Sequence, residues 1–97
     1  MNMQKLLKQA KEMEKKMRQE LDETIVETTV GGGMVRTKMN GHKHLLEVRI
    51  DPEAMDPEDP ELLQDLVLAA VNEAIRKVDE EMKQRFGSLA GTIPKIL

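Results

Sequence analysis

The sequence contains no cysteine, no tryptophan and no tyrosine, and its only aromatic residue is Phe86. Without cysteine the chain can form neither a disulfide bond nor a thiolate zinc site. A hydrophobic core has to be built from aliphatic side chains and methionine. The scarcity of aromatic rings also argues against binding of single-stranded nucleic acid, which depends on bases stacking on such rings.

Long apolar segments are also missing. No run approaches the roughly 18 apolar residues of a membrane-spanning helix. The N-terminal segment KLLKQAKEMEKKM is charged throughout and does not resemble a signal peptide. We therefore expect a soluble, cytoplasmic protein without a membrane partner, and the 97 residues suit a single domain, 1–97.

The charge is unevenly distributed. The formal net charge is −3 and the pI is about 5.4. Residues 1–20 nevertheless carry six lysines and arginines against three acids, while residues 51–65 carry seven acids and no base. A local patch governs contact with a charged partner, and net charge governs solubility and long-range steering.

Residues 3–22 have the pattern of an amphipathic helix with two stripes. Good helix formers fill this stretch, which has no proline or glycine. Basic residues lie roughly opposite the apolar stripe at about 100° per residue. The apolar stripe, with a period near 3.5 residues, comprises Met3, Leu6, Ala10, Met13 and Met17.

The period then changes to two. Residues 24–30, 34–40 and 44–50 are predicted strands, because β-branched residues or apolar alternation fill them. Residues 60–86 are predicted to form a second helix with a broad apolar face, followed by an apolar tail, 88–97. The predicted fold class is α+β, in the order α-β-β-β-α, with a three-stranded antiparallel meander.

Asn40-Gly41 is a strong hairpin signal between the second and third predicted strands. A two-residue turn at this point places Val35 opposite Leu46 and Thr37 opposite His44. The apolar residues of both strands then lie on one face of the sheet.

Two motifs suggest ligands but have simpler explanations. Gly31–Gly33 lies between two strands and lacks the following Gly-Lys-Ser/Thr and helix of a phosphate-binding loop, so a bend is favoured. Residues 51–61 repeat Asp-Pro-Glu without the alternating ligands and central glycine of a calcium loop. Asp59, Pro60 and Glu61 instead suit a helix start.

Catalysis is not expected. His42 and His44 share one strand face, but no third metal ligand stands at a recognisable spacing, so polar surface is the favoured interpretation. No serine or threonine occupies a nucleophile elbow. We expect no enzyme activity, no metal, no cofactor and no small-molecule substrate.

The apolar stripe of the first helix predicts a homodimer. The second helix can cover the apolar face of a three-stranded sheet, which leaves the stripe without a partner. Pairing with a second copy would bury it, and twofold dimers are the commonest oligomers. The alternative is that the first helix folds back onto the sheet of its own chain.

Three segments together resemble the YbaB/EbfC family of bacterial nucleoid-associated proteins. They are LLKQAKEMEKKM, GGGMVRTKMNGHKHLLEVRIDPEAM and LVLAAVNEAIRKVDEEM, which run from about Leu6 to Met82. The resemblance implies a homodimer with the order α-β-β-β-α that binds double-stranded DNA in the nucleoid. It also implies largely sequence-independent backbone contacts and effects on DNA conformation and gene expression.

The resemblance assigns DNA contacts to the two terminal helices. Acidic residues interleave with the bases of the second helix, which leaves open which helix dominates. The candidate DNA-binding residues are Lys5, Lys8, Lys11, Lys15, Lys16, Arg18, Arg76, Lys77, Lys83 and Arg85.

Two functions remain open. Lysines on one helix face can neutralise duplex phosphates and release counterions. Alternatively, the acidic segment 51–65 and the methionine-rich stripe could make the dimer a protein–protein interaction module without DNA binding, because methionine adapts to varied surfaces.

Overall fold

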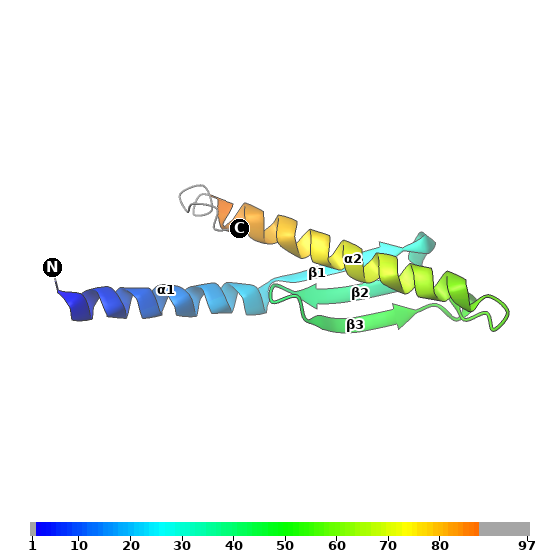
Figure 1. Ribbon diagram of the computed structural model, residues 1–97, viewed down its shortest axis with the longest axis horizontal. Coiled ribbons are helices and arrows are strands. Elements are labelled where there is room, and N and C mark those ends of the chain that lie inside the picture. The colour runs from blue at the N-terminus through cyan, green and yellow to red at the C-terminus, as the bar shows by residue number, and fades with distance from the viewer. Residues whose placement is uncertain (1, 88–97) are drawn as a thin grey trace.

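The computed structural model describes residues 2–87 and has the predicted α+β architecture (Figure 1). A helix precedes a three-stranded antiparallel sheet, and a second helix follows it. The elements in order are α1 (Met3–Glu23), β1 (Ile25–Val30), the 3₁₀ turn η1 (Gly31–Gly33), β2 (Val35–Asn40), β3 (Leu45–Ile50), the 3₁₀ turn η2 (Pro52–Ala54) and α2 (Pro60–Arg85). The predicted tail 88–97 lies outside the described residues.

The molecule is elongated because α1 extends beyond the end of the sheet (Figure 1). The radius of gyration is 18.6 Å, whereas a compact domain of this length has about 12.5 Å. The side chain of Asn2 caps the start of α1 by accepting a hydrogen bond from the Gln4 amide at 3.0 Å. No residue of α1 is buried, so this helix does not fold back onto the sheet.

The core lies between α2 and one face of the sheet, which we call the inner face. The buried apolar residues of the described chain are Val35, Met39, Ala54, Ala70, Ala74 and Val78. Small side chains on α2 allow the helix to approach β1 and β2 closely. In this interior Thr28 hydrogen-bonds Thr37 across the strands and donates to the Ala70 carbonyl at 3.2 Å. The α2 helix packs mainly against β1 and β2.

The predicted hairpin register is wrong. Val35 lies opposite Ile50 and Thr37 opposite Val48, and the register shifts between Lys38 and Met39. The cause is the Asn40 side chain, whose oxygen accepts hydrogen bonds from the amides of His42 (2.9 Å) and His44 (3.0 Å). These bonds stabilise a longer loop, closed by the Asn40 amide on the His44 carbonyl at 3.0 Å.

The longer loop preserves the predicted faces. The observed register differs from the predicted one by an even number of residues, and side chains alternate with a period of two. Val48 and Ile50 therefore share a face with Val35 and Thr37, as the alternation predicts.

The glycine run and the Asp-Pro-Glu repeats form turns and a helix cap. Gly31, Gly32 and Gly33 all have positive φ angles, between 61° and 97°, and connect β1 to β2 as the predicted bend. Asp51 and Asp56 accept hydrogen bonds from the amides two residues on, each at 2.9 Å. Asp59 caps α2 by accepting from the Leu62 amide at 3.3 Å, so the predicted cap is confirmed.

Three contacts fix the base of α1. The Gly41 amide donates to the Leu21 carbonyl at 2.9 Å. The Asp22 carboxylate lies 2.7 Å from Nε2 of His42, and Arg85 of α2 pairs with Glu20 at 2.7 Å. A hairpin loop and the end of α2 thus hold α1 from two sides.

Replacing Gly41 by alanine is expected to destabilise the fold, because the added Cβ would lie 2.6 Å from the Leu21 carbonyl oxygen. Overpacking against backbone costs about 1–3 kcal/mol. Urea unfolding at fixed protein concentration measures the change. Gly87→Ala is the matched control, because its Cβ would meet nothing within 4 Å. Equal stability of both variants would contradict the close approach.

Candidate nucleic-acid interface

The basic face of α1 carries five lysines that point into solvent. Every residue of α1 from Met3 to Gln19 is exposed. Arg18 pairs with Glu14 at 2.9 Å. Within residues 2–87, no ion pair involves Lys5, Lys8, Lys11, Lys15 or Lys16. These lysines therefore present uncompensated positive charge along a projecting helix.

The basic residues of α2 have neighbours that offset their charge. Arg76 lies 2.6 Å from Glu73 and 2.8 Å from Glu80. The hydrogen bond from Arg76 holds the pKa of Glu73 below its ordinary value. The hydrogen bond to Glu73 and, after it, the hydrogen bond to Glu80 raise the pKa of Arg76.

The remaining α2 candidates differ from one another. Lys77 donates to the backbone carbonyl of Glu27 at 3.1 Å, which ties α2 to β1. Arg85 pairs with Glu81 at 3.1 Å and with Glu20 at 2.7 Å, and these bonds raise its pKa. Lys83 is exposed. Local and tertiary pairing therefore makes Arg76, Lys77 and Arg85 less accessible to an external anion than the α1 lysines.

The apolar stripe of α1 is open to solvent. Met3 is 71% exposed and Met13 is 55% exposed, while Leu6, Ala10 and Met17 are also exposed. A hollow of about 430 Å³ separates this stripe from the end of α2, and its apolar lining comes from Met13, Met17 and Phe86. The stripe therefore continues toward α2 of the same chain.

A second open apolar surface lies where α2 leaves β3 uncovered. On the inner face of β3, Leu46 is 52% and Val48 is 41% exposed. One flank of α2 forms an open groove of about 510 Å³. The groove is lined by Leu63, Gln64, Val67, Leu68 and Val71.

The sequence-based prediction missed this second surface. It assigned the whole apolar face of the second helix to the sheet of the same chain. The signal was the width of that face, which extends from Leu63 and Val67 round to Val71 and Ile75. A face this broad exceeds what one narrow sheet can cover.

The two histidines lie in the hairpin loop next to the base of α1. They lie near no metal-ligand cluster among the described residues. Their rings stack with centroids 5.7 Å apart, and His42 contacts Asp22. No group of three or more potential metal ligands occurs among residues 2–87. Within the same range, no helix is long and apolar enough to cross a membrane.

Comparison with known proteins identifies relatives over nearly the whole chain. A sequence model of the YbaB/EbfC DNA-binding family matches residues 1–93. A nucleoid-associated protein of Pelotomaculum thermopropionicum is 44% identical, over 95% of this chain and 90% of that protein. A nucleoid-associated protein of Ruminiclostridium cellulolyticum is 46% identical, over 93% and 84% respectively.

The fold is also similar to a solved structure. The crystal structure of the uncharacterized protein HP0035 from Helicobacter pylori superposes with a TM-score of 0.76 at 27% sequence identity. The match covers 93% of this chain and 98% of that chain. The order of helix, three strands and helix is thus shared with a distant relative.

Arg76→Gln is expected to raise the pKa of Glu73 toward the ordinary carboxyl range, because it removes the hydrogen bond that lowers this pKa. A lowered folded-state pKa stabilises the folded chain above the unfolded-state pKa, and that contribution disappears as pH falls through the folded-state pKa. NMR titration of the Glu73 carboxyl measures the change. Arg18→Gln is the control and should leave Glu73 unaltered; an unchanged pKa in Arg76→Gln would contradict the assignment.

Proposed function

This chain belongs to the YbaB/EbfC DNA-binding family, and we propose that it binds the backbone of double-stranded DNA as a homodimer, through the lysine face of α1. Its relatives are named nucleoid-associated proteins, which supports a site of action in the nucleoid of the cytoplasm. It acts by binding and not by catalysis.

The observation that carries this proposal is that the α1 lysines are exposed and form no ion pair with a described residue. From Lys5 to Lys16 the helix rises about 16 Å, a length over which a duplex carries roughly ten phosphates. Each lysine that contacts a phosphate releases condensed counterions, which favours binding at low salt. The chain's net charge of −3 does not oppose this, because the acids are concentrated elsewhere.

Among the candidates, Lys5, Lys8, Lys11, Lys15 and Lys16 form the main contact, with Arg18, which pairs with Glu14, at its edge. Lys83 can join them, whereas Arg76, Lys77 and Arg85 serve mainly to tie α2 to its surroundings. Lysine is a point charge on a flexible stem, and its attraction to a phosphate does not depend on the base sequence. The contacts are therefore largely independent of DNA sequence.

The homodimer is supported by the surface that one chain leaves open. The solvent-accessible area is 7802 Å², whereas a compact monomer of 11.0 kDa exposes about 5,600 Å². The α1 stripe of Met3, Leu6, Ala10, Met13 and Met17 contributes to this excess, and so do the α2 groove and β3. Pairing of two copies through these surfaces would bury them and double the basic face.

The alternative function is a protein–protein interaction module without DNA binding. The same methionine stripe and the α2 groove favour it, because both could receive an apolar partner. Binding through these surfaces would tolerate salt, whereas phosphate binding would not.

Fluorescence anisotropy of a labelled random-sequence duplex tests the DNA proposal. We expect the logarithm of the binding constant to fall with the logarithm of salt concentration, with a slope near −0.9 per phosphate neutralised and several units in total. Lys8→Glu with Lys15→Glu should abolish binding at moderate salt. Lys8→Arg with Lys15→Arg keeps the charge and should retain binding; no binding by the unaltered chain at low salt would overturn the proposal.

Met13→Asp with Met17→Asp is expected to weaken the dimer about tenfold or more, because carboxylates would be buried in an apolar contact. Val48→Asp tests the β3 surface in the same way. Sedimentation equilibrium measures the association constant. Gln19→Asp, on the opposite side of α1, is the control and should leave it unchanged. A monomer at all concentrations of the unaltered chain would rule out the dimer.

A further inference from the structure

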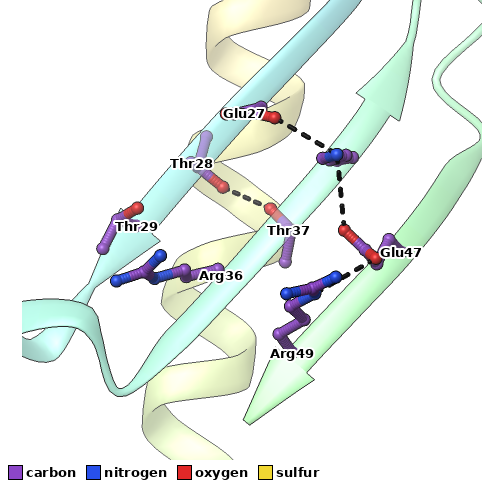
Figure 2. A pocket seen from close by; sticks show the side chains of 8 residues that line it. Glu27, Thr28, Thr29, Arg36, Thr37, Glu47 and Arg49 are labelled. Carbon is purple, nitrogen blue, oxygen red and sulfur yellow. Dashed lines mark hydrogen bonds and ion pairs between the residues drawn. The ribbon is translucent and has the colours of Figure 1, made fainter. Parts of the chain in front are cut away.

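The outer face of the sheet, opposite α2, carries a regular arrangement of charge (Figure 2). Side chains from the three strands form two rows that cross the sheet. The first row contains Glu27, Lys38 and Glu47, and the second contains Thr29, Arg36 and Arg49. The two rows are neighbours, because their members are two residues apart on each strand.

The first row is charge-complementary. The Lys38 ammonium lies between two carboxylates, 3.4 Å from Glu27 and 3.7 Å from Glu47. Opposite charges on directly paired strand residues stabilise a sheet. Lys38 is therefore paired within this row, which keeps one negative charge in excess.

The second row places two like charges on paired residues. Arg36 and Arg49 are directly opposite each other, an arrangement that destabilises a sheet unless an anion offsets it. Arg49 contacts Glu47 at 3.2 Å, the carboxylate that Lys38 also approaches. Arg36 forms no ion pair with any described residue.

The two arginines border open hollows. A pocket of about 220 Å³ between the rows is lined by both guanidinium groups and by Thr29. A second hollow of about 200 Å³ adjoins it at Gly33, Arg36, Arg49, Ile50 and Asp51. Figure 2 shows Arg36 reaching toward Thr29 while Arg49 turns toward Glu47. Three carboxylates also border these hollows: Glu27 faces Lys38, Glu47 lies between Lys38 and Arg49, and Asp51 accepts a hydrogen bond from the Glu53 amide.

We propose that Arg36 and Arg49, with the Thr29 hydroxyl, form a phosphate-binding site on the outer face of the sheet, separate from the α1 lysines. Guanidinium groups bind phosphate oxygens through planar, paired N–H donors, and a phosphate between the two arginines would relieve their repulsion. The ligand is a phosphodiester of the DNA backbone, so this inference rests on the proposed function.

The openness of the site favours a polymer over a free phosphate ion. Both arginines are exposed, and an isolated ion would remain largely hydrated there. A duplex held by α1 would instead present its phosphates at high effective concentration. Along the long axis, Arg36 lies about 25 Å from Lys15, summing the rise of α1 and of β2, which is less than one turn of DNA.

The test compares Arg36→Gln with Lys38→Gln by duplex anisotropy across salt concentrations. Both variants remove one positive charge from the same strand and face, but Lys38 already has two carboxylate partners. We expect Arg36→Gln to reduce the salt slope by about 0.9 for each chain bound and to weaken binding to all sequences alike. Lys38→Gln should change the slope by much less. Circular dichroism checks that both variants fold.

Three outcomes would overturn the inference. If Arg36→Gln retains the full slope while Lys8→Glu with Lys15→Glu abolishes binding, the outer site fails and the proposed function stands. If the unaltered chain binds no duplex, both fail. If inorganic phosphate shifts the Arg36 side-chain NMR signal to saturation below millimolar concentration while the duplex slope is unaffected by Arg36→Gln, the ligand is a free phosphate and not DNA.

Discussion

The packing of α2 across β1 and β2 determines the rest of this structure. Ala70, Ala74 and Val78 bring the helix close to the buried side of β2, and the Thr28 hydroxyl reaches the Ala70 carbonyl. A single helix cannot cover three strands at this distance, so β3 keeps an open inner face. The same packing occupies the β1 and β2 part of the inner face, and no residue of α1 is buried.

Charge is distributed differently in three regions of the molecule. On α2, carboxylates one helical turn away pair with the arginines, so the second half of that helix is nearly neutral. On α1, lysines predominate and form no ion pair with a described residue. On the outer face, one row of the sheet pairs a lysine with two carboxylates, and the adjacent row carries two arginines and no carboxylate. Formal net charge describes none of these regions.

Local signals in the sequence were sufficient for the elements and their ends. Asp59-Pro60 marked the start of α2, β-branched residues marked β1, and alternation marked β2 and β3. The register could not be obtained in this way, because the Asn40 side chain competes with the backbone for the loop amides. This error matters, since a two-residue turn would set Arg36 opposite Leu45 and the paired arginines would not exist. Likewise, Glu20 and Arg85 are 65 residues apart, so no local pattern shows that they neutralise each other.

The contacts at the base of α1 hold this helix at one end only. Gly41, His42 and Arg85 hold only the last turn of the helix, and the remaining turns are unsupported. The free part of α1, residues 3–19, is therefore about 26 Å long and is held at one end only. A rotation of 10° at its base would move its free end by roughly 5 Å, about the pitch of one helical turn.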